Sequence, residues 1–409
     1  MYWDQWDFYT PLFQDGTLWD IFNRQHGPHR QGIGFILTSI IAQISGWNSR
    51  WDAFGVSFVL MGAAGLGFLL VRRCGAHGFG LIVIPLLFLN IRQYEIFVGA
   101  ANISHGAMPI FLFMSLCLAW FIRPIGWRLS ALCFLTFLLI FTGFGLFVGF
   151  LVPLVLAVQA IHHFQRKEKR KGLSIVFALT GIGLAWVIFA CGYRFDPAVD
   201  GFRFPYEKPL EYLFFVASML NNYHGIRGYG IFVLSIGVFT LAILVVMAIW
   251  HGWRIIQGDE QDQNRSVVIF CLAAFTVIYC FETAVGRVFL GWKEASVASR
   301  YVTLLIPAGL ALYLCFSGLK NRTLSNMLCF FYVALLLTGT LRLHKSDLRT
   351  IHTYSDGRLA WKAAYLKTGD ERQSSERANF LIYPATELKD RLRFLEKWQL
   401  NLFNANSTP

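Results

Sequence analysis

The first residues of the chain include two acids that could carry out catalysis. Asp4 and Asp7 stand three positions apart in the run MYWDQWDF, so a helical turn would place both carboxylates on one face. Such a pair can act as a general base with a partner, or it can hold a divalent cation through its oxygens. The alternative is that both are solvated loop acids beside the interfacial residues Trp3 and Trp6.

Basic residues follow in the same stretch. His29 and Arg30 come directly after Gly27 and Pro28, where an apolar helix is expected to begin. Backbone donors at a helix N-terminus, together with a fixed cation and an imidazole, suit a phosphate group. A basic side chain that reaches the lipid headgroups would have the same pattern.

A second basic group lies on a short expected loop much later in the chain. With a histidine at the end of an earlier helix, this loop provides the remaining candidates for binding a substrate phosphate: His105, Arg287, Lys293, Arg300 and Tyr301. Three cations close together would suit a phosphate or pyrophosphate. The alternative is contact with phospholipids and ion pairing with Glu282 and Glu294. Elsewhere, Arg92 and Glu95 stand three apart in NIRQYE and are expected to pair with each other.

The composition excludes a soluble globular protein, because 56% of the 409 residues are hydrophobic and only 15% are charged. The net charge of +12 falls mostly in short loops between apolar runs, which favours orientation in a bilayer over binding of nucleic acid. The eight cysteines show no spacing typical of zinc sites. No P-loop or flavin fingerprint is readable, so no organic cofactor is expected. A divalent cation, Mg or Mn, remains compatible with the acidic pair.

The apolar runs predict an all-α polytopic membrane helix bundle. About ten segments approach the roughly 20 apolar residues that cross a hydrocarbon core. They lie near 53–71, 80–97, 106–122, 129–142, 144–162, 172–191, 229–250, 266–284, 298–317 and 324–342. The segments 129–142 and 144–162 could form a tight hairpin at Gly143 and Gly145, or one long helix with a re-entrant piece.

Orientation follows from the basic segment 164–171, FQRKEKRK, which is expected in the cytoplasm. The loops 98–105, 192–228 and 285–297 then face outside. The aromatic and acidic loop 192–228 is typical either of a sugar-binding surface or of an ordinary interfacial loop. Counting back, residues 1–52 should also lie outside. Either the short N-terminus is translocated with the first helix or an earlier span is missing, and we expect the second, a truncated N-terminus.

Three parts are therefore predicted. Residues 1–52 form an outward acidic loop with an interfacial helix at 30–46, because the run Ile33–Ile44 is too short to cross comfortably. Residues 53–342 form the transmembrane helical domain. Residues 343–409 form a charged, outward-facing tail that is too small for its own core and is expected to pack on the outer face.

With these features the chain resembles bacterial members of the GT-C class of polytopic membrane glycosyltransferases, which use polyprenyl-phosphate sugar donors. The resemblance rests on short motifs: DQWD in the first outer loop, HGPHR before a horizontal helix, ANISH, ASRY at the end of the cationic loop, and LEKWQLNLF in the tail. It implies a protein of the bacterial cytoplasmic membrane with its site facing outside. The acceptor would be a glycan or lipid of the cell envelope.

The resemblance also implies roles for the candidate residues. Asp4 or Asp7 would be the general base, and His29, Arg30 and the later cations would hold the donor phosphate. A polysaccharide polymerase or ligase acting on lipid-linked oligosaccharide would use the same chemistry. A transporter or flippase is the alternative from another class, although no inverted repeat and no mid-membrane cluster of charges is readable. A non-catalytic membrane protein is the last alternative.

Overall fold

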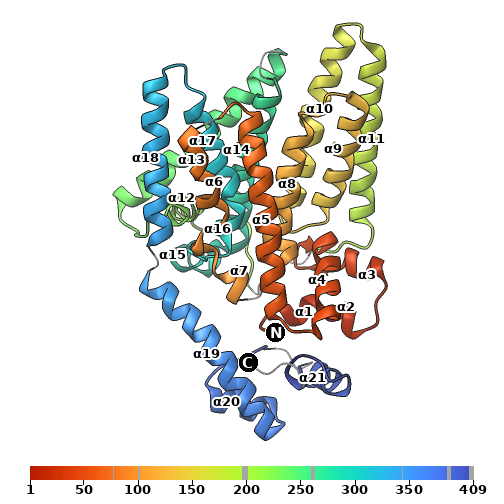
Figure 1. Ribbon diagram of the computed structural model, residues 1–409, viewed down its shortest axis with the longest axis vertical. Helices are drawn as coiled ribbons and strands as arrows, with labels where there is room; N and C mark the ends of the chain where they lie inside the picture. Colours follow the sequence, from red (N-terminus) through yellow and green to blue (C-terminus); the bar gives the residue numbers. More distant parts are fainter. Residues whose placement is uncertain are drawn as a thin grey trace.

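The computed structural model describes residues 1–76, 78–99, 102–195, 201–258, 263–342, 344–384 and 388–404. Within these ranges the chain is almost entirely helical, as Figure 1 shows. The exception is one antiparallel hairpin of two short strands, β1 (Gln25–His26) and β2 (His29–Arg30), in which Gln25 faces Arg30 and His26 faces His29. The predicted all-α class is confirmed.

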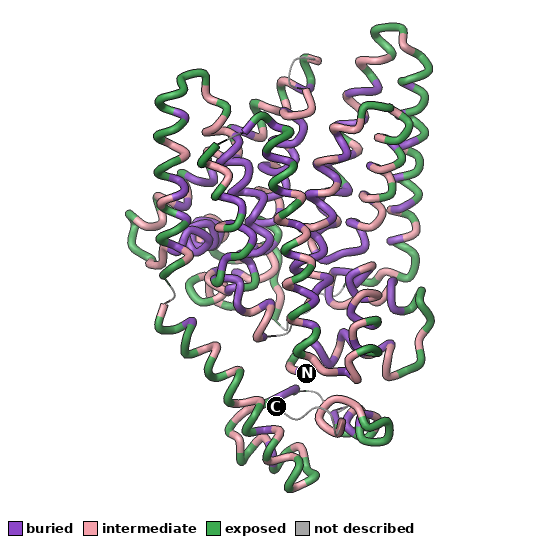
Figure 2. The backbone as a smooth tube through the Cα atoms, viewed as in Figure 1, coloured by how far each residue is buried: buried purple, intermediate pink, exposed green. Residues whose placement is uncertain are grey.

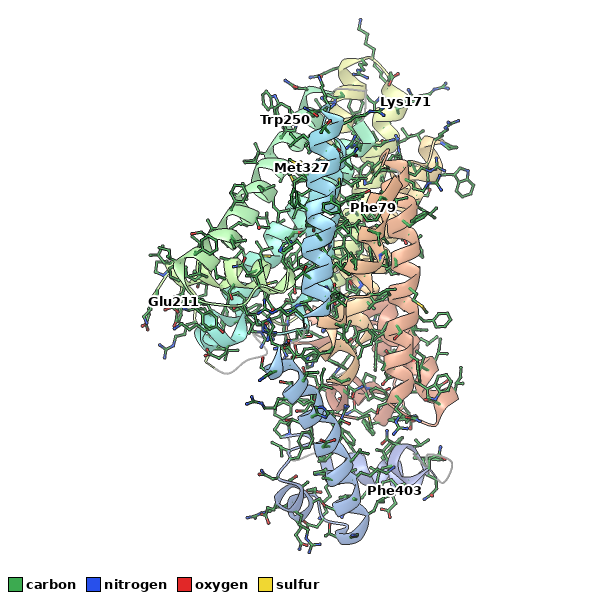
Figure 3. The ribbon with its side chains drawn as sticks, turned by 60° about the vertical axis from the view of Figure 1, so that its left-hand side comes forward. Phe79, Lys171, Glu211, Trp250, Met327 and Phe403 are labelled. Carbon is green, nitrogen blue, oxygen red and sulfur yellow. The ribbon has the colours of Figure 1, made fainter. Side chains whose placement is uncertain are left out.

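Among the described residues, six helices are long and apolar enough to cross a membrane. They are α5 (Arg50–Arg73), α10 (Val148–Gln165), α11 (Lys169–Ala190), α13 (Ile231–Gln257), α14 (Gln263–Arg287) and α18 (Arg322–Leu341). Their outer faces carry large apolar side chains. Figure 3 shows Trp250 and Met327 standing out from α13 and α18, and they are 62% and 47% exposed. These features indicate a membrane protein.

Shorter apolar helices occupy the other predicted spans: α6 (Val83–Phe88), α8 (Met108–Ala119), α9 (Ile125–Ile140) and α17 (Ile306–Ser317). The run 80–97 is interrupted at Asn90, whose side chain accepts a hydrogen bond from the Arg92 amide and caps a new turn. Six helices therefore have the length of a full crossing, and the total of about ten spans stays a prediction. The structure also divides α9 from α10 at a turn, as the hairpin alternative predicts, with Phe144 at a φ of 55°.

The core of the bundle lies at its centre. Figure 2 shows α8, α14 and α17 largely buried, whereas α11 and α18 expose most of their outer faces. The rings of Phe113 and Phe275 pack against each other between α8 and α14, with their centroids 5.0 Å apart. Gly237 lets α13 approach α12 (Leu210–Tyr223) closely, because a Cβ there would lie 2.1 Å from the Ala217 carbonyl oxygen. The outer faces are thus left for lipid.

Residues 1–52 form a small head of short helices at one end of the bundle (Figure 1). They are α1 (Gln5–Phe8), α2 (Thr10–Phe13), α3 (Leu18–Asn23) and α4 (Gly32–Ser45). The head is fixed to α5 by Asp52, which accepts hydrogen bonds from Tyr9 Oη at 2.8 Å and Gln5 Nε2 at 3.3 Å. A helix exists where an interfacial one was predicted, and its position relative to a bilayer stays a prediction.

The tail contains α19 (Lys345–Thr368), α20 (Glu371–Ala378) and α21 (Leu388–Lys397). The tail packs against the head and shares an apolar core with it. Leu392 and Leu395 of α21 and Trp361 of α19 share one apolar cluster with Trp6 and Trp47 of the head. The backbones also meet, since the Trp3 amide donates to the Ile382 carbonyl at 2.9 Å. Head and tail together form one polar cap on the bundle.

The remaining elements are short turns that join these helices, and several of them line the site. They are η1 (Gly78–Ile82), η2 (Ile91–Gln93), α7 (Glu95–Val98), η3 (Ile103–Ala107), η4 (Gly145–Phe147), η5 (Val288–Leu290), α15 (Trp292–Ala295), α16 (Tyr301–Leu304) and η6 (Asn401–Phe403).

Candidate functional site

Asp4 lies half-buried at the start of α1, and its charge interacts with that of Arg300. Its backbone carbonyl accepts hydrogen bonds from the amides of Asp7 and Phe8, which begins the helix. Its carboxylate receives no hydrogen bond from any residue that the structure describes. The charges of the head and of the loop before α16 therefore act on each other, although the two segments stand far apart in the sequence.

Arg300 is held by contacts that leave its guanidinium accessible. Its backbone amide donates to Glu95 Oε2 at 2.8 Å, and its Nη1 lies 4.0 Å from Glu95 Oε1. The guanidinium lies over the ring of Tyr301 at 5.5 Å, and the side chain is 53% exposed. Ser299 fixes the turn from behind, because its Oγ donates to the Arg92 carbonyl at 2.6 Å and accepts from the Glu95 amide at 3.1 Å. Arg300 is thus a fixed and exposed cation whose charge interacts with that of Asp4.

Asp7 has a different neighbourhood. Its carboxylate accepts a short hydrogen bond from Tyr383 and lies 3.5 Å from Arg391 Nη1, and both partners belong to the tail. Asp4 and Asp7 therefore have separate partners and do not form the joint site that their spacing suggests. No group of three or more His, Cys, Asp or Glu side chains in the described ranges is arranged to hold a metal ion.

A cluster of three histidines lies beside α1. The rings of His26 and His29, from the β-hairpin, lie 6.2 Å and 5.5 Å from the ring of His105, in the π-helical turn η3. Phe8 touches this cluster, with its ring 4.8 Å from His26 and 5.7 Å from His105. Asp4 and Phe8 stand one helical turn apart, so they share a face of α1. Phe8 therefore connects α1 with the histidine cluster.

The His29 ring is buried and uncharged. Burial, followed by the charges of His26 and Arg287, lowers the pKa of His29 to about 3. Its Nδ1 accepts a weak hydrogen bond from the Phe144 amide at 3.5 Å. The influence of Arg287 places the end of α14 near this cluster. Arg287 is half-buried, and no described residue pairs with its guanidinium.

The other candidate cations lie elsewhere. Arg30 is 2% exposed and donates to the carbonyls of Asn23, Phe189 and Cys191, so its role is to hold the end of α11 against the head. These four bonds leave one of its five N–H donors, so Arg30 serves mainly to hold the backbone, and its predicted role in binding a phosphate stays a prediction. Lys293 is exposed and lies over the rings of Tyr229 and Trp292, at 5.7 Å and 5.8 Å. Of the three cations on the later loop, Arg287 and Arg300 interact through their charges with His29 and Asp4 of the head, and Lys293 lies over these rings.

The expected pair of Arg92 and Glu95 is not formed. Glu95 binds Arg300 instead, whereas Arg92 is buried and donates to Asn222 and to the Arg342 carbonyl. Its Nη2 lies 2.6 Å from Asn222 Oδ1. The two side chains therefore point in different directions, because three-residue spacing brings them together only on one continuous helix. Here the 3₁₀ turn that contains Arg92 ends at Gln93, and a new helix begins at Glu95.

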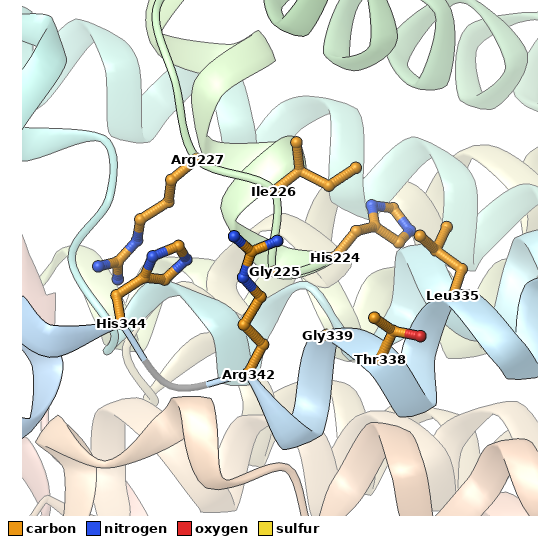
Figure 4. A pocket seen from close by; sticks show the side chains of 9 residues that line it. All are labelled: His224, Gly225, Ile226, Arg227, Leu335, Thr338, Gly339, Arg342 and His344. Carbon is orange, nitrogen blue, oxygen red and sulfur yellow. The ribbon is translucent and has the colours of Figure 1, made fainter.

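Sequence reasoning also missed a second cluster of cations, shown in Figure 4. A cavity of about 150 Å³ lies between the end of α12 and the junction of α18 with α19, with Arg227, Arg342 and His344 on its walls. Arg227 is held by Asp347 at 2.8 Å, and Tyr94 donates to the same carboxylate at 3.1 Å. The only signal for it in the sequence is a set of polar residues around otherwise apolar helix ends.

The predicted outer loop 192–228 is not one long loop. It contains the helix α12, whose residues 215–223 are buried within the bundle. Residues 196–200 lie outside the described residues. The exposed part before α12 is held by a surface ion pair between Arg203 and Glu207 at 3.1 Å. The loop's buried second half therefore serves packing and supplies Asn222 to Arg92.

The comparisons with known proteins add no relatives to this geometry. No family model, curated protein or solved structure matches the chain.

Proposed function

We propose that this protein is a membrane glycosyltransferase that moves a sugar from a polyprenyl-phosphate donor to a hydroxyl group of a cell-envelope glycan or lipid. The observation that supports this proposal most is Asp4, whose carboxylate receives no hydrogen bond from a described residue and whose charge interacts with that of the exposed Arg300. A transfer from an activated phosphate donor needs a base for the acceptor and a positive charge for the leaving phosphate.

The base is Asp4. The acceptor oxygen attacks the anomeric carbon of the donor sugar and forms the new glycosidic bond. The bond between that carbon and the phosphate oxygen breaks, and its electron pair leaves with the polyprenyl phosphate. Asp4 takes the proton of the acceptor hydroxyl. A carboxylate with no competing hydrogen-bond donor is well suited to this step, because nothing in its surroundings has to be displaced.

The leaving phosphate is stabilised by Arg300 and Arg287. Both are arginines, whose guanidinium fork matches two phosphate oxygens at once. Arg300 is preorganised by Glu95 and Tyr301, so little reorganisation is needed when negative charge develops. His29 stays uncharged at neutral pH and serves as a wall of the site. A Mg or Mn ion, if one takes part, would be held by the Asp4 carboxylate and would supply positive charge for the leaving phosphate, and adding EDTA to the assay tests it.

Asp7 serves positioning. It binds Tyr383 and Arg391 and so holds the tail against the head that carries Asp4. The lipid part of the donor would lie along the apolar outer helices, where large side chains such as Phe58 on α5 are exposed. The site itself would face the outside of the bacterial cytoplasmic membrane, as the distribution of Lys and Arg predicts.

The test uses the protein in proteoliposomes supplied with radiolabelled polyprenyl-phosphate sugars and an envelope extract as acceptor. Asp4→Asn keeps the size of the side chain and removes the base, and transfer is expected to fall by about 100-fold or more. Asp15→Asn is the matched control, because Asp15 lies exposed in the same head with a φ of 50°, which asparagine also tolerates. Transfer by Asp4→Asn at the wild-type rate contradicts the assignment. The size of the labelled product separates single transfer from polymerisation.

A further inference from the structure

A second cavity lies at the other end of the bundle from Asp4. It has a volume of about 490 Å³ and is formed where α5 ends and where α9 and α14 begin. Figure 1 shows that α5 begins at the head and runs through the bundle away from it. The cavity is therefore separate from the proposed glycosyltransferase site.

Three arginines face this one space, and each comes from a different helix. Arg73 is the last residue of α5, Arg128 lies in the first turn of α9, and Arg265 lies near the start of α14. The side-chain amides of Gln263 and Asn264 border the same space. No carboxylate belongs to its described lining. Like charges around one cavity repel each other, so the arrangement favours an anion.

Arg128 gives an independent indication. Its Nε is buried and has no hydrogen-bond partner among the described residues. A buried donor without a partner is costly, and native proteins rarely leave one unused. The Arg265 guanidinium uses only part of its hydrogen-bonding capacity within the protein, where its Nη2 donates to the Leu314 carbonyl at 2.9 Å. Both arginines thus keep N–H groups that no described residue accepts.

The chemistry of these groups identifies a phosphate. Guanidinium groups bind phosphate oxygens in a bidentate manner, and amide side chains can donate to the remaining oxygens. The cavity is much larger than the roughly 30 Å³ share of one water molecule. It has room for a phosphate with the polar group attached to it.

The surroundings favour a phosphate that belongs to a lipid. Trp127, next to Arg128, is 74% exposed, and Phe79, labelled in Figure 3, is 67% exposed. Exposed aromatic rings beside basic residues at the ends of apolar helices are typical of the depth of lipid headgroups. Basic pockets between membrane helices bind anionic headgroups. We propose that this cavity binds the phosphate of an anionic membrane lipid.

The experiment measures binding of phosphatidylglycerol to the full chain. Purified protein in a neutral detergent is titrated with phosphatidylglycerol, with phosphatidylcholine and with inorganic phosphate, and melting temperature and native mass spectra are recorded. Phosphatidylglycerol is expected to raise the melting temperature and to remain bound in the mass spectrum. Equal effects of phosphatidylcholine contradict selection by charge, and equal effects of inorganic phosphate contradict the lipid.

Matched variants locate the site. The double variant Arg73→Gln/Arg128→Gln removes two of the three charges, and its affinity for phosphatidylglycerol is expected to fall by about tenfold or more. Arg123→Gln is the control, because Arg123 is exposed near the same end and does not line the cavity. Arg128→Lys keeps the charge but lacks the Nε donor. This single variant still tests the site if the double variant fails to fold. Wild-type affinity in Arg128→Lys and in the double variant overturns the proposal.

Discussion

Asp4 at the start of α1 and Arg300 at the start of α16 lie near enough for their charges to interact. One belongs to the polar head and the other to the loop after α15. This interaction requires that the head sits on the end of the bundle, where the Tyr9–Asp52 hydrogen bond of 2.8 Å and the apolar cluster with the tail hold it. The proposed catalytic pair is therefore a product of the whole fold.

The first prediction concerns Arg300. Arg300→Gln removes the charge that would stabilise the leaving phosphate, so kcat is expected to fall by on the order of 100-fold. Arg300→Lys keeps the charge but lacks the fork, and an intermediate rate is expected. Lys293→Gln is the control, since Lys293 lies over Tyr229 and Trp292 away from Asp4. If Lys293→Gln loses as much activity as Arg300→Gln, Arg300 has no special role.

The second prediction separates Arg30 from Arg287. Arg30 donates four hydrogen bonds to backbone carbonyls, so Arg30→Gln is expected to lower the melting temperature and to leave the rate per folded molecule unchanged. Arg287 has no described partner, so Arg287→Gln is expected to keep the melting temperature and to lower the rate. Thermal unfolding and transfer assays on the same preparations decide between these outcomes. The reverse pattern would return Arg30 to the site.

The third prediction is a dependence of stability on pH. Burial lowers the pKa of His29 to about 3, below the ordinary value of 6.5. The unfolded chain therefore takes up a proton at this residue before the folded protein does, and stability is lost as the pH falls from about 6.5 towards 3. The loss at pH 5 amounts to about 2 kcal/mol from this residue alone.

His29→Asn tests this dependence, because its Oδ1 can replace Nδ1 as the acceptor for the Phe144 amide without a group that titrates. The fall in melting temperature between pH 7 and pH 5 is expected to be smaller in this variant than in the wild type. An equal fall in both proteins shows that His29 is not responsible.

The fourth prediction concerns the attachment of the tail. Asp7→Asn weakens the contacts with Tyr383 and Arg391, so α20 and α21 are expected to separate from the head more often. Limited trypsin digestion should cut the tail roughly fivefold faster, which corresponds to about 1 kcal/mol. Asp15→Asn again serves as the control. Some loss of transfer is expected alongside, because the tail supports the head. Digestion of Asp7→Asn at the wild-type rate would show that Asp7 does not attach the tail to the head.

Much of the fold can be predicted from local sequence. The runs predicted at 172–191 and 324–342 agree closely with α11 (Lys169–Ala190) and α18 (Arg322–Leu341), because a helix of apolar residues satisfies its own backbone hydrogen bonds. The placement of Asp4 in a polar head outside the long helices also follows from composition. These properties depend on neighbours within a few turns, which the sequence displays directly.

Which residues pair with the polar side chains depends on how distant segments pack together, and this packing cannot be predicted from the sequence alone. Arg92 and Glu95 were expected to pair, but each binds a residue far away in the chain, Asn222 and Arg300. The two acids of DQWD cannot be distinguished from the sequence, yet Asp7 accepts a hydrogen bond from the tail and the charge of Asp4 interacts with that of Arg300. Runs of apolar residues become helices because the backbone hydrogen bonds of a helix join residues only four positions apart. Which charges meet is decided only when those helices pack, because each contact is a long-range one.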